Sequence, residues 1–402
     1  MRLHHRAVPI ALAAILIDTI GFGIVLPVLP SLITRLGHVD LPTATRIGGY
    51  MLIAFAVTQF FAGPILGNLG DRYGRRPVLL AAMTAFSLDY LLMAFAPTLA
   101  WLFVGRAIAG VTGAVYGPVN AAIADVTPPE KRGAVYGLMG AAFGAGFILG
   151  PALGGLLTGW GERAPFFAAA GLAMLNAISI AVALPETLAP ENRRPFDWKR
   201  ANVFGAFAPV FHAGGAAPLL VGSLLWQLAH MVYPATWAFW AEIAMGWDGR
   251  AIGWSLAASG LSMMVAQALL VGRAIKRFGE ERTMLIGLAV GVVVFGLYVF
   301  AERGWQVYAL IGVGALTGFV FPSINAILSR RVDARNQGAL QGGMASIGSV
   351  AAVIGPLAMT QALAFGSERG FAGGAFALAS ALAALTFAVM LFGVVMKRGK
   401  LA

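Results

Sequence analysis

Two carboxylates and one guanidinium lie in stretches of sequence that are otherwise apolar: Asp18, Asp89 and Arg106. A charged carboxylate at the centre of a bilayer costs roughly 2.5–3.5 kcal/mol on insertion scales, and desolvation disfavours the ionised form. Such a group can hold a proton near neutral pH and release it when water or a cation reaches it. The two acids are therefore predicted to carry protons or to sense a substrate. The alternative is that each only hydrogen-bonds a neighbouring helix and stabilises packing.

Arg106 needs an acceptor, because a guanidinium does not lose its charge in proteins. We expect a carboxylate to pair with it, and a substrate or rearrangement that separates the pair would let the acid take up a proton. The alternative is a static buried ion pair, which is weak evidence for stability in any case.

Composition shows what surrounds these residues. Of the 402 residues, 59% are hydrophobic and 11% are charged, whereas soluble domains carry about 25% charged residues. Most of the protein surface must therefore face lipid. Because the chain has no cysteine, disulfides and thiolate metal sites are excluded. The net charge of +11 does not indicate nucleic acid, since Lys and Arg form short clusters between apolar runs.

Those runs have the length that spans a bilayer as a helix. Backbone polar groups in lipid must be satisfied internally, so the sequence predicts an all-α membrane protein. Twelve transmembrane helices are expected, at residues 8–36, 47–69, 77–96, 99–124, 133–159, 164–184, 216–240, 251–272, 283–301, 305–329, 338–365 and 371–396.

The basic residues give an orientation for these helices. With the first six residues on the cytoplasmic side, only six of the 28 Lys and Arg residues fall in the opposite loops, namely Arg35, Arg46, Arg163, Arg250, Arg303 and Arg369. The positive-inside rule then predicts that both termini are cytoplasmic. We expect the inner membrane, because an outer-membrane barrel would show short alternating segments instead.

The chain repeats itself at an offset of 205 residues. Gly67 and Gly74 correspond to Gly272 and Gly279, and the pair Gly150-Pro151 corresponds to Gly355-Pro356. We therefore expect two six-helix bundles, residues 1–184 and 203–402, joined by a charged cytoplasmic linker at 185–202. Parallel halves with a binding site near the midplane are a recurring transporter plan.

Several segments resemble a known family. The stretches 67–77 (GNLGDRYGRRP) and 150–155 (GPALGG) resemble the loop signature of the major facilitator superfamily and the antiporter motif of its drug/proton exchangers. Within that superfamily, the tetracycline-resistance efflux (TetA-like) proteins are similar at residues 18–30, 87–90, 105–114 and 337–342. The resemblance implies the major facilitator fold and proton-driven export of a small amphipathic molecule. It also places Arg106 at a motif position near the proton site.

The 67–77 stretch has a mechanical interpretation. Glycines permit a tight reversal, Asp71 could accept hydrogen bonds at a helix N-terminus of the facing half, and nearby arginines could bond carboxylates. The segment would then hold the cytoplasmic side closed in the outward-facing state, although positive-inside topology alone could explain the cations. The residues of this predicted gate are Gly67, Asp71, Arg72, Gly74, Arg75 and Arg76.

Small residues line up along the fifth predicted helix, in the antiporter motif. Glycine allows close packing and proline allows bending in membrane helices. This face could pack against the other half and limit leak, or simply form a helix–helix contact, and the two interpretations overlap. The residues are Gly146, Gly150, Pro151, Gly154 and Gly155.

Isolated polar residues inside helices are unfavourable facing lipid, so they are candidates for a substrate cavity. These are Gln59, Asn120, Gln227, His230, Gln267 and Asn325. His230 could titrate in the physiological range, but a single histidine is more often a satisfied interior donor.

The resemblance covers nearly the whole chain but departs from the family's pattern at two positions in the second half. Tetracycline exporters typically carry an aspartate in the ninth helix, where this sequence has Gly291. Met263 stands where some relatives have histidine. Extra charge for a metal–drug chelate is therefore missing from the C-terminal half.

We therefore expect a proton-coupled antiporter of a tetracycline-like drug or of several drugs. The alternative is a proton-coupled transporter of a native metabolite such as a sugar or amino-acid derivative. An enzyme is not expected, because the sequence has neither a nucleotide-binding loop nor a His/Glu metal pair at helical spacing. We expect no cofactor, no metal site and no nucleic-acid partner, with the proton gradient as energy source and a monomer in the bilayer.

Overall fold

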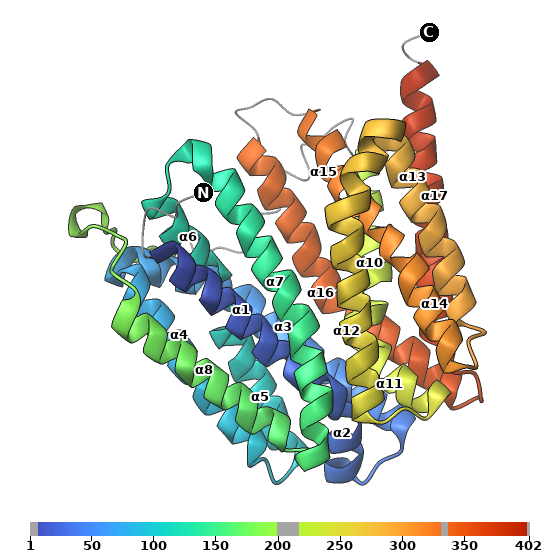
Figure 1. Ribbon diagram of the computed structural model, residues 1–402, viewed down its shortest axis with the longest axis horizontal. Coiled ribbons are helices and arrows are strands. Elements are labelled where there is room, and N and C mark those ends of the chain that lie inside the picture. Colours follow the sequence, from blue (N-terminus) through green and yellow to red (C-terminus); the bar gives the residue numbers. More distant parts are fainter. Residues whose placement is uncertain (1–6, 199–216, 331–336, 400–402) are drawn as a thin grey trace. The chain divides into compact units, whose positions relative to one another are not determined.

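The computed structural model describes residues 7–198, 217–330 and 337–399, which are almost entirely helical. The chain ends, the last part of the predicted linker (199–202) and the start of the predicted second bundle lie outside the described residues. Figure 1 shows the helices along the chain. Ten helical segments of the described chain are long and apolar enough to cross a membrane.

The first half of the chain contains seven longer helices and one short one. They are α1 (Ala7–Val25), α2 (Leu29–Gly37), α3 (Leu41–Tyr73), α4 (Arg75–Ala94), α5 (Leu99–Thr112), α6 (Tyr116–Val126), α7 (Pro129–Leu157) and α8 (Ala164–Ala183). Short 3₁₀ segments occur at Leu26–Val28 (η1), Thr158–Trp160 (η2) and Pro190–Asn192 (η3).

The second half contains α10 (Ala217–His230), α11 (Val232–Met245), α12 (Gly249–Val265), α13 (Gly272–Tyr298), α14 (Gly304–Gly314), α15 (Val320–Arg330), α16 (Gln337–Ser367) and α17 (Gly374–Gly399). A π-helix, η6 (Ala266–Val271), continues α12 into α13, and a 3₁₀ segment, η7 (Ala315–Phe319), separates α14 from α15.

Four of the twelve predicted spans are interrupted in the middle. A proline lies three or four residues after a residue of each interruption. Proline lacks an N–H group, and its ring clashes with the carbonyl of residue i−4, so a regular helix cannot continue at that point. The prolines are Pro30, Pro118, Pro234 and Pro322, which follow the breaks at η1, 113–115, Met231 and η7. The breaks recur at the 205-residue offset, since 26–28 corresponds to 231–233 and Gly113 to Gly318.

The described residues form two compact units. Unit 1 comprises Met1–His38, Ala54–Val203 and Asp248–Gly260, and unit 2 comprises Val39–Ile53, Phe204–Trp247 and Leu261–Ala402. In unit 1, α1 packs along α7 and α8, and α4 packs on α8 and α5 (Figure 1). In unit 2, α17 packs on α10 and α13, and α16 packs on α10 and α11.

Two long helices are divided between the units. The first turns of α3 belong to unit 2, where Gly49 packs against Thr360 of α16. The first turns of α12 belong to unit 1, where a methyl group on Gly253 would lie 2.8 Å from the Cα atom of Gly155 in α7. Thr360 is the counterpart of Gly155 at the 205-residue offset, and Gly49 lies one residue after the counterpart of Gly253, so the two contacts occupy similar places in the repeat.

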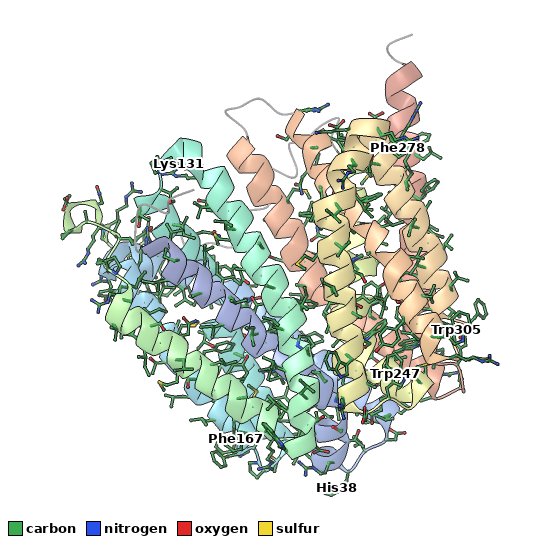
Figure 2. All side chains as sticks on the ribbon, in the orientation of Figure 1. His38, Lys131, Phe167, Trp247, Phe278 and Trp305 are labelled. Atoms are coloured by element: carbon green, nitrogen blue, oxygen red, sulfur yellow. The ribbon has the colours of Figure 1, made fainter. Side chains whose placement is uncertain are left out.

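Aromatic side chains mark the ends of the helices of unit 2. Trp247 and Trp305 lie at one end of this unit, and Phe278 lies at the other (Figure 2). Trp305 is largely exposed, as tryptophans at a membrane interface are. A packed aromatic core joins the end of α13 to the start of α17, where Tyr298 stacks on Phe376 with ring centroids 4.7 Å apart.

Candidate functional site

Asp18 lies in the middle of α1, against a small cavity. Apolar side chains from α1, α4, α6 and α8 line this cavity, among them Met83, Val119 and Ile180. The Oδ1 atom of Asp18 is fully buried and has no hydrogen-bond partner among the described residues. Burying an unpaired carboxylate costs far more than burying a carboxylic acid, so this pocket favours the protonated group.

A hydroxyl pair lies beside this pocket. The Thr19 hydroxyl donates to the carbonyl of Ile15 over 2.8 Å, and its Oγ1 atom is 3.5 Å from the hydroxyl oxygen of Tyr116. Tyr116, on α6, also lines the Asp18 cavity. Sequence analysis did not identify this tyrosine, because nothing in its local spacing indicates that α6 comes to lie beside α1.

Asp89 and Arg106 are buried on the neighbouring helices α4 and α5, with 2% and 5% of their surfaces exposed. The expected ion pair is not formed between them. Both Asp89 oxygens and the Arg106 Nε atom have no hydrogen-bond partner within the described part of the chain. Arg106 instead donates from Nη2 to the Met93 sulfur, 3.1 Å away. The sequence thus predicted the burial of both groups, but not the thioether partner.

The three charged groups predicted for proton coupling all belong to unit 1. Tyr90 of α4 directly follows Asp89, and its ring lies beside Gly21 of α1, three residues from Asp18. Two unpaired acids and a cation that keeps its charge therefore share one helical unit. This arrangement can bind and release protons with small rearrangements of side chains.

The cytoplasmic motif forms a polar cluster within unit 1. Arg75 is 7% exposed and bridges Asp71, at 2.6 Å, and Asp125 of α6, at 3.3 Å. The Arg72 guanidinium lies 4.9 Å from the ring centre of Tyr73. Asp71 is thus paired inside its own unit. Its predicted role toward a helix of the facing half stays a prediction.

Glu186 caps the helix that follows this motif. Its carboxylate accepts hydrogen bonds from the backbone N–H groups of Arg75, at 2.8 Å, and Arg76, at 3.3 Å, at the start of α4. A carboxylate there is favoured by the unpaired N–H groups and the helix dipole. Arg76 also donates to the carbonyl of Ala181. Gly74 has φ of +105°, a backbone conformation that favours glycine.

The described part of the predicted linker also lies on the motif, through Arg194 and Asp197. Asn68 donates to the carbonyl of Asp197 over 2.6 Å, and the Asp197 N–H donates to the Asn68 side chain over 3.3 Å. The Arg194 N–H donates to the backbone carbonyl of Asp71 over 3.0 Å. Gly67 has open space around it. Sequence analysis missed Asn68, Asp125 and Glu186. The last two are acidic, and the number of arginines in the motif could have indicated that acidic partners were needed.

The glycines of the antiporter motif pack mainly on α1. A methyl group on Gly146 would lie 2.9 Å from the Leu16 carbonyl oxygen, and one on Gly150 would lie 2.7 Å from that of Ile20. Gly154 meets the Ile24 carbonyl in the same way. The contacts advance four residues at a time on both helices, and Pro151 packs against Gly23 of α1. Gly155, on another face, contacts α12 within unit 1.

The predicted cavity residues divide between the units. Gln59 donates to the Gly113 carbonyl, over 3.3 Å, at the break between α5 and α6, and Gln267 donates to the Gly318 carbonyl, over 3.2 Å, in η7. Asn120 is exposed. Asn325 donates to the carbonyl of its own helix at Phe321. The side-chain amides of Gln59 and Gln267 therefore both donate to backbone carbonyls at helix breaks.

Gln227 and His230 lie on α10 in aromatic surroundings. Both Gln227 Nε2 and His230 Nδ1 are buried and have no hydrogen-bond partner among the described residues. The His230 ring centre is 4.9 Å from that of Trp226 and 6.0 Å from that of Phe295. A methyl group on Gly291 would lie 2.8 Å from the Trp226 ring. An indole thus fills the position where the resembling exporters carry an acid.

Metal ligands do not gather anywhere in the described ranges, where no group of three or more His, Cys, Asp or Glu side chains could hold an ion.

Comparison with known proteins agrees with this architecture. The Major Facilitator Superfamily model matches residues 11–356 and 219–400. The chain belongs to the major facilitator superfamily. It is a multi-pass protein of the inner membrane, and its relatives include resistance proteins with similar lengths.

Tetracycline resistance protein, class C, of Escherichia coli is 38% identical over 89% of this chain and 89% of its own length. The class G protein of Vibrio anguillarum is 37% identical over 87% of this chain and 88% of its own length. Multidrug resistance protein 2 of Bacillus subtilis (strain 168) is 27% identical over 86% of each chain.

Solved structures share the fold at lower identity. The human organic anion transporter MFSD10 (TETRAN) superposes with a TM-score of 0.70 at 23% identity, covering 97% of this chain and 100% of its own. The nucleoside transporter NupG superposes with a TM-score of 0.75 at 14% identity, covering 97% and 98%. At these identities the likeness concerns the fold alone.

Proposed function

We propose that this protein is a proton-coupled antiporter that exports a small amphipathic drug, tetracycline-like or one of several, by alternating access. The observation that carries the proposal is a pair of acids in unit 1, of which Asp89 is buried and Asp18 is half-buried. Asp18 Oδ1 and both oxygens of Asp89 have no hydrogen-bond partner in the described part of the chain. An acid inside the bilayer without a partner destabilises the protein, so such acids are generally found where they have a function. Binding and releasing protons is the function that these two carboxyl groups can perform.

In the proposed cycle, the substrate enters from the cytoplasm while Asp18 or Asp89 is deprotonated. Protons from the periplasm then bind these acids, the substrate leaves outward, and the protonated carrier returns. Arg106 stabilises whichever acid is ionised, because opposite charges favour the ionised form of a carboxyl. The proton gradient drives the cycle, and no cofactor or metal is needed.

We propose twelve transmembrane helices with both termini in the cytoplasm. The ten spans found by length and composition treat Gly249–Tyr298 as one segment, but Gly279 inside it has non-helical backbone angles and would separate two spans. A further span would combine α10 and α11, which are broken only at Met231. The distribution of basic residues supports the orientation.

The two homologous bundles would be residues 1–184 and 203–402, joined by the linker 185–202. The recurrence of the helix breaks at an offset of 205 residues supports this division. In the outward-facing state, the cluster around Asp71 and Arg75 would hold the cytoplasmic side closed. The polar residues Gln59, Asn120, Gln227, His230, Gln267 and Asn325 would contribute to the substrate cavity, and the carrier would act as a monomer.

The names of the relatives favour a drug over a native metabolite as substrate, since they are tetracycline and multidrug resistance proteins. The ring of Trp226 occupies the space beside Gly291. This favours a drug whose recognition needs no acid from the C-terminal half.

The test uses purified protein in proteoliposomes with an imposed pH gradient. Uptake or export of tetracycline and of a panel of cationic and neutral amphipathic drugs is followed together with the internal pH. Wild-type protein should move substrate and protons in opposite directions. Asp18→Asn and Asp89→Asn should each abolish gradient-driven transport but leave the protein folded.

Asp248→Asn is the matched control for these variants. Asp248 accepts the Ala251 N–H at the start of α12 over 2.8 Å, and asparagine caps helices as well as aspartate does, so this variant should transport normally. Unchanged gradient-driven transport in both Asp18→Asn and Asp89→Asn would refute the proton assignment. Transport of every substrate without any proton movement would refute antiport itself.

A further inference from the structure

A methionine is the observed hydrogen-bond partner of the buried arginine in unit 1. Arg106 donates from Nη2 to the Met93 sulfur over 3.1 Å, with 5% of the arginine and 2% of the methionine exposed. A thioether is a weak acceptor, whereas Asp89, on the same helix as Met93, offers two free oxygens. The guanidinium is therefore bound to the weaker of two nearby acceptors.

Gly105 explains why both acceptors come so close together. A methyl group on this glycine would collide with the Met93 side chain at Cγ, would lie 2.9 Å from its sulfur, and would lie 3.2 Å from Oδ1 of Asp89. The thioether and the carboxyl group thus flank the same notch in α5. The next residue of α5 is Arg106 itself, so both acceptors lie beside the stretch of α5 that carries the guanidinium.

We propose that Met93 is a positioning residue that holds the Arg106 guanidinium away from Asp89 while Asp89 carries a proton. When the O–H bond of Asp89 breaks and the proton passes to water, the guanidinium moves from the sulfur to the new carboxylate. Reprotonation of Asp89 returns the guanidinium to the sulfur. This inference rests on the proposed function, because it assigns a role within the same proton cycle.

The two acceptors differ in strength in the way such an exchange requires. The guanidinium is charged in both arrangements, but only the carboxylate is a charged acceptor, whereas a thioether is a weak neutral one. Ionised Asp89 therefore attracts the guanidinium more strongly than the sulfur does. A protonated carboxyl lacks that charge, and the polarizable, flexible thioether can then compete. A leucine at position 93 would remove this competitor without adding a charge.

The other ionisable groups around Asp89 do not offer it a second cation. Of the helices packed on α4, α8 has no ionisable side chain, α5 contributes Arg106, and α6 contributes Tyr116 and Asp125, the latter paired with Arg75. Within α4, Tyr90 is adjacent, and its ring packs beside Gly21 of α1, the helix that also carries Asp18. Among these groups, Arg106 is the cation that remains for Asp89.

The experiment compares the pH dependence of proton-driven drug export in proteoliposomes for wild type and Met93→Leu. Without the sulfur, Arg106 should stay with Asp89 and favour its ionised form, so the midpoint of the profile should move to lower pH by about one unit, a tenfold change in proton affinity. Met93→Gln, which offers an amide oxygen as acceptor, should restore the midpoint toward the wild-type value.

Met284→Leu is the matched control. Met284 lies on α13 in unit 2 and is fully buried, so this variant also loses a buried thioether, but far along the chain from the proton site. Its midpoint should equal that of wild type. A midpoint that is the same in Met93→Leu as in wild type would overturn the proposal, as would an equal shift in Met284→Leu.

A second measurement does not depend on transport. Infrared difference spectroscopy of the purified protein follows the protonated carboxyl of Asp89, identified as the band that Asp89→Asn removes. Its titration midpoint should be lower in Met93→Leu, even if that variant transports poorly, and an unchanged midpoint would overturn the inference. If the wild-type protein showed no proton-driven export at all, the proposed function would be refuted. The infrared measurement would still test the role of Met93, so the failure of the proposed function can be distinguished from the failure of this inference.

Discussion

Gly150 lies in α7 where the helix touches the backbone of α1. A methyl group at this position would be 2.7 Å from the carbonyl oxygen of Ile20 and 2.9 Å from the Cα atom of Gly23. Ordinary contacts begin at 3.4 Å, so the substitution Gly150→Ala would require α1 and α7 to separate by about 0.7 Å at this point. Both contacted atoms belong to the backbone, so no side chain can rotate away.

The expected cost follows from a matched pair of variants. Gly144 lies in the same helix and has no atom within 4 Å of its missing methyl group. Alanine is about 1 kcal/mol better than glycine within a helix, but this gain is common to Gly150→Ala and Gly144→Ala. The difference between the two is therefore the overpacking cost, about 1–3 kcal/mol of unfolding free energy.

The assay is thermal unfolding of both variants in detergent, followed by gradient-driven export at equal amounts of reconstituted protein. Gly144→Ala should melt at or above the wild-type temperature and should transport normally. Gly150→Ala should melt lower, and its export should fall further than its stability alone explains, because a displaced α1 carries Asp18 away from its pocket. Equal melting temperatures in the two variants would show that the close contact of α1 with α7 is not what this glycine serves.

Three further predictions concern the ends of the helices. Arg46→Glu should weaken the packing of the start of α3 against the end of α16, because Arg46 pairs with Glu368. In hydrogen exchange this variant should lose protection in α3, and the double variant with Glu368→Arg should regain it. Absence of this rescue would count against the ion pair. The hydrogen bond from Arg46 holds the pKa of Glu368 below its usual range, so the pair's contribution is complete above the carboxyl's unfolded pKa and is lost as pH falls through the lower folded value. The difference in melting temperature between wild type and Glu368→Gln should accordingly disappear in acid. Gly74→Ala should destabilise the protein by about 1–3 kcal/mol, because Gly74 has φ of +105° and faces the Glu186 carboxylate. An unchanged melting temperature would contradict this prediction.

The helix breaks show how far local sequence information reaches. The predicted spans were treated as continuous, yet each of the four breaks is followed by a proline: Pro30, Pro118 and Pro322 come four residues after a residue of their breaks, and Pro234 comes three residues after Met231. That signal was present in the sequence, because a proline's effect on the carbonyl four residues earlier is local. It was missed because hydropathy alone, which ignores the hydrogen-bonding capacity of the backbone, sees one uninterrupted apolar run.

Composition and spacing were enough to predict an all-helical membrane protein, its repeat and the burial of Asp89 and Arg106, because the cost of placing charge in an apolar medium does not depend on the details of packing. Asp18 is half-buried. The partner of Arg106 could not be predicted in this way. Met93 is its acceptor only because α4 and α5 approach closely at Gly105, and that approach depends on side chains far apart in sequence. The same holds for Glu186 at the start of α4 and for Trp226 beside Gly291. Local chemistry decides which residues must avoid lipid, whereas only the packed helices decide which of their neighbours they meet.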